Sequence, residues 1–123
     1  LPDCAEIFGP GSRAEPELIA RVRDGERAIE IPARLDRLVV GADSILFADF
    51  KSDAAVPASP DGIPAHHLEQ LAAYRVALAQ AFPGRRQRAF LIFTAAPRVF
   101  EIPAESLESA WLRLKTQWSP ASA

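Results

Sequence analysis

The sequence predicts a single α/β or α+β domain in which helices flank a mixed β-sheet. Two features support this prediction. Two short apolar runs, 44–51 and 88–94, have the length and composition of buried strands. Two longer segments, 64–82 and 104–118, carry apolar residues at helical spacing. The expected order along the chain is β-β-β-α-β-β-α, which places strands and helices in one layered unit.

The first third of the chain is expected to form a lead-in and two strands. Residues 1–12 are rich in Gly and Pro and should be irregular. The pattern over 13–23 predicts a strand, which Pro16 moves toward a sheet edge because proline has no N–H to donate. A second strand is predicted over 27–40, with Pro32 interrupting it.

The centre of the chain predicts a turn, a loop and a long helix. The Gly-Ala-Asp run at 41–43 is a turn signal before the strand at 44–51. Residues 52–63 are rich in Pro, Ser, Asp and Gly, which predicts a mobile loop able to cover a site as a lid. Pro64 suits the first position of the helix at 64–82. We expect that helix to bury one apolar stripe, made of Leu68, Leu71, Ala72, Leu78, Ala79 and Phe82.

The last third of the chain predicts two strands and a helix. Pro83 and Gly84 should end the preceding helix. Strands at 88–94 and 98–102 follow, and Pro103 opens the last helix. Its side chains Leu107, Trp111, Leu114 and Trp118 lie within a narrow arc, so this face should dock on the sheet.

Length and composition fit one domain covering 1–123. The chain has 123 residues, of which 49% are hydrophobic, enough to bury a core. No apolar run reaches the ~20 residues that a membrane-spanning helix needs, and no signal peptide is visible. The single cysteine, Cys4, cannot form an internal disulfide. Together these features predict a cytoplasmic protein with no membrane partner.

Two further features concern the ends and the charge of the chain. The chain starts with Leu1 and contains no methionine, so we expect it to be a piece of a longer polypeptide. The net charge of −2 does not by itself indicate nucleic-acid binding. Arg85, Arg86 and Arg88 nevertheless cluster, either on a solvated face or in a local strip that contacts phosphates.

The residues that could carry chemistry lie around the turn at 41–43. If Ala42 and Asp43 form a two-residue hairpin loop, counting outward from the loop places Asp36 opposite Asp49. Directly opposed side chains have Cβ atoms about 4.5–5.5 Å apart. Lys51 lies two residues beyond Asp49 and so points to the same face of the strand. The simplest register therefore brings two carboxylates and an ammonium group together.

Two carboxylates at this distance repel each other and raise each other's pKa, which a cation would relieve. Ligands that are all oxygen suit Mg²⁺ or Mn²⁺. Asp36 and Asp49 are therefore candidate metal ligands, the backbone carbonyl of Phe50 could add a ligand, and Lys51 could stabilise a reacting phosphate or orient water. The alternative is structural: Asp36 simply pairs with Lys51 or with a neighbouring arginine, Arg34 or Arg37.

The long helix offers further candidates at its border. Gln70 and Tyr74 are four residues apart, so they lie side by side and could reach from the edge of the core into a site. An ordinary half-buried tyrosine beside a surface glutamine is the alternative. By helical angle, His67 lies on their side and His66 points away; either could bind a metal, although exposed helical histidines are commoner.

Glu15 is the remaining acidic candidate, on the first predicted strand, and Glu17 competes with it for that role. The sequence has no glycine-rich phosphate loop, no nucleophile elbow and no paired zinc-ligand spacing. ATP binding by this piece is therefore not predicted.

At this point the chain resembles a known family. The segments ARLDRLVV (33–40), ILFADFKSD (45–53) and QLAAYR (70–75) resemble, in this order, three motifs of the RecB-family nucleases, a branch of the PD-(D/E)xK superfamily. The stretches FGPGSRAE, FPGRR and IFTAAPRVFEIP are similar to the C-terminal end of the AddA-type helicase–nuclease subunit of alphaproteobacteria. The resemblance covers nearly the whole chain and implies a restriction-endonuclease-like fold.

The resemblance also implies roles for individual residues. Asp36 and Asp49 match metal-binding aspartates, Lys51 a catalytic lysine, and Glu15 an acidic residue of the first strand. A further pair, Gln70 and Tyr74, matches residues that support the site and contact DNA. The implied activity is a Mg²⁺-dependent exonuclease in double-strand break repair. Its parent would bind ATP through helicase domains and pair with an AddB-type subunit.

The chain departs from the family pattern in three ways. Ala33 stands where glycine is usual, and Asp53 where asparagine is frequent. The family's metal-binding histidine belongs to a helix upstream of the first strand, outside these residues, and His66 and His67 are in the wrong place to replace it. The isolated piece is therefore expected to bind metal weakly and to cut poorly.

Two other functions remain open from the sequence. The first is a non-catalytic module that keeps the fold to bind DNA or to dock a partner subunit. The second is a single-domain nuclease of the restriction type, or of the type with an iron–sulfur cluster. The absence of the cluster's cysteines argues against the last form.

Overall fold

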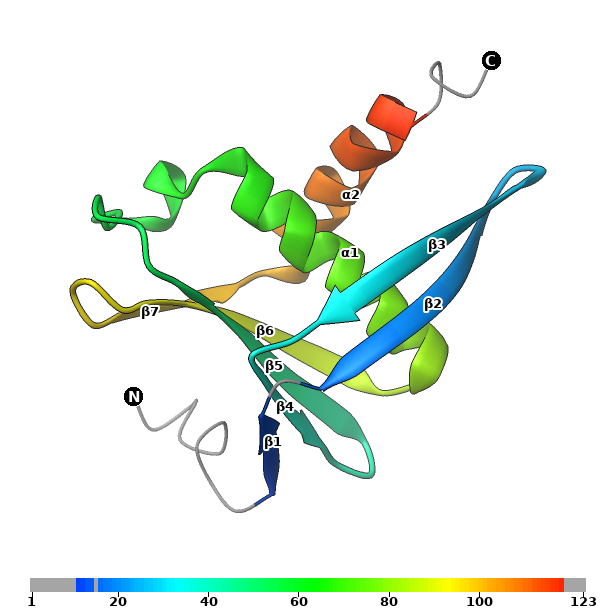
Figure 1. Cartoon of the computed structure of the whole chain (residues 1–123), viewed down its shortest axis with the longest axis horizontal. Helices are drawn as coiled ribbons and strands as arrows, with labels where there is room; N and C mark the ends of the chain where they lie inside the picture. The colour runs from blue at the N-terminus through cyan, green and yellow to red at the C-terminus, as the bar shows by residue number, and fades with distance from the viewer. Residues whose placement is uncertain (1–10, 15, 119–123) are drawn as a thin grey trace.

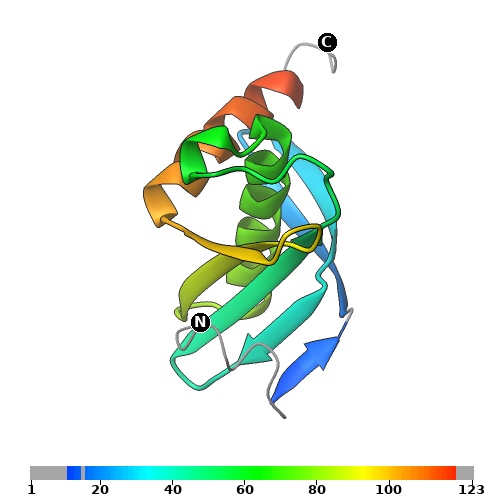
Figure 2. The same cartoon turned by 90° about the vertical axis from the view of Figure 1, so that its left-hand side faces the viewer.

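The core of the fold is a five-stranded mixed sheet with both helices on one side (Figures 1 and 2). The computed structural model describes residues 11–14 and 16–118, apart from the side chains of Asp24 and Trp118. Cys4, Glu15 and the Trp118 side chain therefore lie outside the described residues. The mixed sheet and its flanking helices confirm the predicted fold class. In sheet order the strands are β1 (Ser12–Ala14), β4 (Arg37–Val40), β5 (Ser44–Lys51), β6 (Arg86–Phe93) and β7 (Arg98–Ile102).

One neighbouring pair in this sheet is parallel and the others are antiparallel. The parallel pair is β5 and β6, and α1 (Ala65–Ala81) connects them. Such a crossover is the usual link between parallel strands and places the helix over one face of the sheet. The two strands are buried almost throughout, as their apolar sequences predict: every residue from Ile45 to Asp49 and from Ala89 to Phe93 is buried.

A separate two-stranded sheet consists of β2 (Glu17–Asp24) and β3 (Arg27–Arg34). A two-residue turn joins them, and Gly25 in that turn has a φ of +67°, a conformation that glycine adopts without steric cost. The hairpin lies alongside α1 (Figure 1). Gln80 of α1 ties it in place, because its side chain accepts from the backbone N–H of Arg21 at 2.8 Å and donates to the Arg21 carbonyl.

The structure corrects the two strands predicted before the turn. The segment 13–23 is divided between β1 and β2, and the segment 27–40 between β3 and β4. The second break lies at Leu35 and Asp36, and Pro32 stays inside β3. The chain changes sheets at both breaks because the apolar faces of β2 and β3 pack on α1, while β1 and β4 extend the central sheet. The Leu35 N–H donates to the Pro16 carbonyl at 3.1 Å and joins the two crossing points.

The buried surface of α1 is broader than a single stripe. Ala79, predicted to be buried, is exposed, whereas His67, Ala73 and Ala77 are buried along with Leu71, Ala72 and Leu78. The physical reason is that α1 contacts the sheet, the β2–β3 hairpin and the second helix at once, so that apolar contacts are needed around much of its circumference. Gly84, with a φ of +80°, follows the end of the helix as predicted.

The last helix, α2 (Ala104–Trp118), packs mainly on α1, which corrects the prediction that it docks on the sheet. Leu107 and Ala110 are fully buried in this contact, and Trp111 and Leu114 pack at its edge. The face of the sheet is already occupied by α1, so the apolar arc of α2 meets the helix instead. No described helix is both long and apolar enough to cross a membrane.

The loop at 52–63 contains a 3-10 turn, η2 (Pro60–Gly62), and contacts the core. Pro57 and Ile63 are buried, and the Pro57 carbonyl accepts from Arg98 of β7 at 2.9 Å. Its predicted mobility stays a prediction. The loop connects the end of β5 to the start of α1 and lies beside the residues that carry the candidate chemistry.

Candidate active site

The β4–β5 hairpin has the register that a two-residue loop predicts. Val40 lies opposite Ile45 and Arg37 opposite Ala48, and the Gly41 N–H donates to the Ser44 carbonyl at 2.8 Å. Asp36 directly precedes Arg37, the last paired residue of β4, and Asp49 directly follows its partner Ala48. The Asp36 carboxylate accepts a hydrogen bond from the Phe50 N–H at 2.6 Å, which fixes it beside the end of β5.

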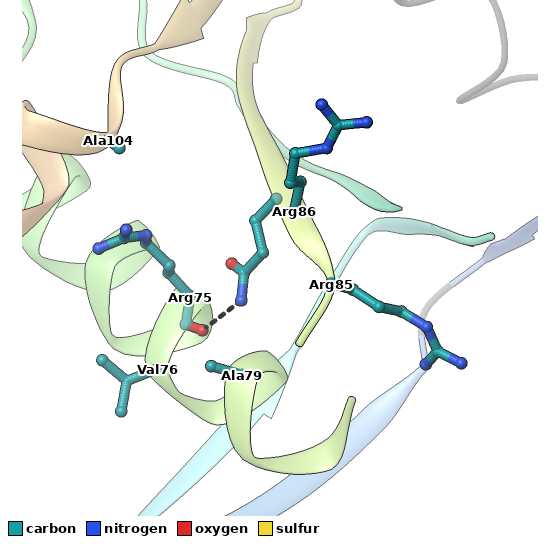
Figure 3. Close-up of a pocket in the computed structure, with 7 residues that line it drawn as sticks. Arg75, Val76, Ala79, Arg85, Arg86 and Ala104 are labelled. Atoms are coloured by element: carbon teal, nitrogen blue, oxygen red, sulfur yellow. Dashed lines mark hydrogen bonds between the residues drawn. The ribbon is translucent and has the colours of Figure 1, made fainter. Parts of the chain in front are cut away.

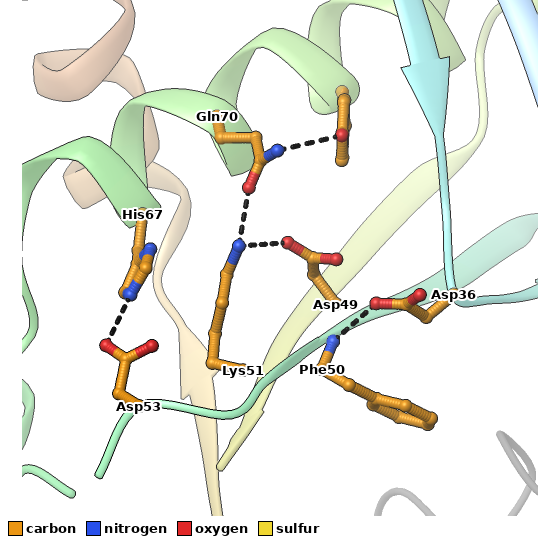
Figure 4. Close-up of polar contacts among 8 residues, drawn as sticks. Asp36, Asp49, Phe50, Lys51, Asp53, His67 and Gln70 are labelled. Carbon is orange, nitrogen blue, oxygen red and sulfur yellow. Dashed lines mark hydrogen bonds and ion pairs between the residues drawn. The ribbon is translucent and has the colours of Figure 1, made fainter. Parts of the chain in front are cut away.

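Asp49 and Lys51 lie on the face of the sheet that α1 covers (Figure 4). Lys51 Nζ is 2.7 Å from Asp49 Oδ2 and donates to Gln70 Oε1 at 2.6 Å. Gln70 in turn donates from Nε2 to the Tyr74 hydroxyl at 3.0 Å. The helix pair at Gln70 and Tyr74 therefore reaches the strand pair through the lysine, and the structure brings together five of the side chains that the sequence singles out.

The electrostatics of Asp49 are those of a buried carboxyl group beside another acid. Its exposed fraction is 6%. Burial raises its pKa to about 6, and the hydrogen bond with Asp36 acts in the same direction, while Lys51 opposes the rise. Burial also raises the pKa of Tyr74, and the nearby Asp49 charge adds to it. Both shifts favour the protonated, uncharged form of the group.

The carboxylate pair fits a divalent cation. Asp49 Oδ2 is buried and meets Lys51 as an ion pair, but it accepts no hydrogen bond of good geometry from the described residues. An oxygen-only site beside a second carboxylate suits Mg²⁺ or Mn²⁺. Within 11–14 and 16–118, no three His, Cys, Asp or Glu side chains are grouped to hold a metal ion. A bound ion would therefore take further oxygen ligands from the backbone, from water or from a substrate.

A second polar contact, between Asp53 and His67, lies next to the lysine. It was not predicted from the sequence. His67 is buried, and its Nε2 is 2.7 Å from Asp53 Oδ2. The hydrogen bond to His67 lowers the pKa of Asp53. His67 also lies near the Phe93 ring, with the centroids 6.2 Å apart, whereas His66 is exposed. The available signal was spacing: Asp53 is two residues beyond Lys51, and His67 is three residues before Gln70.

The structure describes only one of the two acidic candidates of the first predicted strand. Glu15 is not among the described residues. Its competitor Glu17 is exposed and lies 3.7 Å from Arg34 across the β2–β3 hairpin. Arg34 therefore has an acidic neighbour in Glu17, and the Asp36 carboxylate accepts a hydrogen bond from the Phe50 backbone.

The arginine cluster lies at the opposite end of β6 from the carboxylates. A cavity of about 600 Å³ is lined there by Arg75, Arg85, Arg86 and Gln87. Figure 3 shows the guanidinium groups of Arg75, Arg85 and Arg86 pointing in different directions. Arg85 donates to the Ala42 carbonyl at 3.2 Å. Beyond the cavity, Arg88 forms a two-bond pair with Glu101. This arrangement fits a solvated face better than a single phosphate cradle.

Comparisons with known proteins agree with this fold. The chain is similar to the protein titled "Crystal structure of SSO0001", with a TM-score of 0.56 and 17% sequence identity, which supports the fold. The match covers 97% of this chain and 56% of the other, so the chain spans little more than half the length of that protein. No curated protein matches the chain. The sequence profile of the PD-(D/E)XK nuclease superfamily matches residues 6–118, and the chain therefore belongs to the PD-(D/E)XK nuclease superfamily.

Proposed function

We propose that this chain is a Mg²⁺- or Mn²⁺-dependent deoxyribonuclease domain that hydrolyses DNA phosphodiester bonds. The single observation that carries the proposal is the meeting of Asp36, Asp49 and Lys51 at the end of β5, on a superfamily nuclease fold. Asp36 and Asp49 would hold the ion, and the Phe50 carbonyl and Glu15 are further proposed contributors.

Each side chain has a proposed task. A divalent ion bound here supplies Lewis acidity and makes a bound water more acidic. Lys51, held between Asp49 and Gln70, presents a fixed positive charge to the phosphate, where negative charge grows during the reaction. Gln70 holds the lysine in place and Tyr74 holds Gln70. Both side chains would contact the DNA.

We further propose that the domain acts as an exonuclease within a larger cytoplasmic helicase–nuclease of the AddA type. Its parent would repair double-strand breaks, bind ATP through its helicase domains and pair with an AddB-type subunit. The support is the order and spacing of the three motifs that contain Asp36, Lys51 and Tyr74. The match to SSO0001 covers 56% of that chain, so the same fold occurs there within a longer polypeptide.

A second candidate function is a non-catalytic module that binds DNA or docks a partner subunit. Two observations favour it. The described residues offer two acidic ligands rather than three, and the net charge is −2. In this case the carboxylate pair would be a remnant of the catalytic site.

Cleavage of linear DNA tests these proposals. Wild type, Asp49→Asn and Asp43→Asn are incubated with labelled duplex and single-stranded DNA in Mg²⁺, in Mn²⁺ and in EDTA. We expect metal-dependent cleavage by wild type and by Asp43→Asn, whose exposed acid lies in the hairpin turn, and none by Asp49→Asn. Equal cleavage by wild type and Asp49→Asn would refute the active site. DNA binding without Mn²⁺ binding or cleavage would favour the non-catalytic module.

A further inference from the structure

A groove of about 260 Å³ lies next to the carboxylates, between α1 and the open end of the β2–β3 hairpin. Leu18 and Ala33 face each other across its inner side, and Ile19 and Pro32 across its outer side. Tyr74 of α1 and the ion pair of Glu17 and Arg34, 3.7 Å apart, also line it. The lining is therefore mainly apolar, with one aromatic residue and one ion pair.

Ile19 is the most unusual residue of this groove. Its exposed fraction is 78%, compared with 60% for Leu112 and 36% for Phe50, the other exposed large hydrophobic residues of the described chain. A single exposed apolar side chain is common in proteins. Here the exposed side chain borders a concave apolar surface, and that combination is typical of a binding subsite.

Tyr74 connects the groove to the candidate active site. Tyr74 lines the groove, and its hydroxyl accepts from Gln70, which also contacts Lys51. The hairpin wall of the groove also leads to the candidate active site, because β3 ends at Arg34 and Asp36 follows two residues later. A DNA strand whose scissile phosphate lies at Asp36 and Asp49 would therefore have a neighbouring nucleotide within reach of the groove.

Resting on the proposed function, we propose that this groove receives one unpaired nucleobase of the strand being cut, beside the scissile phosphate. Apolar and aromatic surfaces bind the flat face of any base by stacking, with little dependence on sequence. A base inside a duplex is paired and stacked on both sides and would have to leave the stack to enter. The groove therefore selects single-stranded or frayed DNA over fully paired duplex.

The test couples a protein change to a DNA change. A labelled single-stranded oligonucleotide carries one abasic position, which is moved along the strand one nucleotide at a time. Binding is measured by fluorescence anisotropy in EDTA, where no cleavage interferes. For wild type we expect one position at which loss of the base weakens binding by ~5-fold or more, the lower end for one stacked base.

Ile19→Asn should weaken binding of the intact strand by a similar factor, and the abasic change should then have no further effect. Ile19→Phe should keep the sensitivity, and Leu112→Asn, which removes an exposed apolar residue from α2, should behave as wild type. The groove proposal fails if the effects of Ile19→Asn and of base removal multiply, or if no position is sensitive.

Failure of the groove and failure of the nuclease can be told apart. Base-dependent binding with no cleavage would contradict the nuclease proposal and leave the groove in place. Cleavage that Asp49→Asn abolishes, without any base-dependent effect of Ile19, would contradict the groove alone. Thermal unfolding of each variant checks that the exposed substitution leaves the fold intact.

Discussion

Lys51 Nζ lies 2.6 Å from Gln70 Oε1, so the end of the central strand β5 is hydrogen-bonded directly to helix α1. The same ammonium group is 2.7 Å from Asp49 Oδ2. A lysine side chain is long and flexible, and these two contacts hold its charge in one place. The position of the ammonium group beside the carboxylate pair is thus decided by a strand and a helix together.

Replacing Lys51 should affect both cleavage and stability. Lys51→Met removes the charge while keeping most of the side-chain volume, and it leaves Asp49 buried without its countercharge. We expect cleavage to fall by at least ~100-fold and the free energy of unfolding at pH 8 to fall by about 3 kcal/mol. Lys115→Met, in α2, is the matched control and should change neither. Unchanged cleavage by Lys51→Met would remove the lysine from the mechanism.

The raised pKa of Asp49 predicts how stability depends on pH in the metal-free protein. The folded chain binds this proton with a pKa of about 6, compared with 3.8 for an ordinary aspartate. Between these values the folded state holds more protons than the unfolded state, so the free energy of unfolding falls as pH rises through about 6. The full loss should be on the order of 3 kcal/mol.

Urea unfolding in EDTA between pH 4.5 and 7.5 measures about 2 kcal/mol of this loss, with Asp49→Asn as the comparison. The asparagine cannot ionise, so its stability should be flatter over this range. The same slope in both proteins would show that another group is responsible.

Tyr74 and Gln70 should differ in their effects although they are hydrogen-bonded to each other. Tyr74→Phe removes the hydroxyl that accepts the hydrogen bond from Gln70. It should cost about 1 kcal/mol of stability and reduce cleavage less than ~10-fold. Gln70→Ala also removes the Oε1 acceptor that holds Lys51, so its kcat should fall further than that of Tyr74→Phe. Steady-state cleavage kinetics of the two variants measure the difference. A larger kcat loss in Tyr74→Phe would show that the hydroxyl acts directly on the substrate.

The Asp53–His67 contact should hold the first turn of α1 against the end of β5. Asp53→Ala leaves a buried imidazole without its carboxylate partner. We expect faster amide hydrogen exchange in the first turn of α1 and a moderate loss of cleavage, because Gln70 follows His67 by one turn. Asp61→Ala, an exposed acid in the same loop, is the control. Equal exchange rates in both variants would contradict this role.

The sequence by itself determined the local geometry of the site. A two-residue loop at Ala42 and Asp43 fixes the hairpin register, and the alternation of side chains along a strand puts Asp49 and Lys51 on one face. Helical spacing likewise puts Gln70 beside Tyr74. These relations depend only on residues close together in the chain, so their geometry could be predicted from periods and loop length.

The tertiary structure decided everything that joins distant segments. The sequence predicts one strand over 27–40 with an interruption at Pro32. The chain instead leaves one sheet for another at Leu35 and Asp36, because β3 packs on α1 and β4 pairs with β5. The burial of His67 against Asp53 and the packing of α2 on α1 have the same origin. Each depends on which apolar surfaces meet once the chain has folded, and local spacing does not specify that choice.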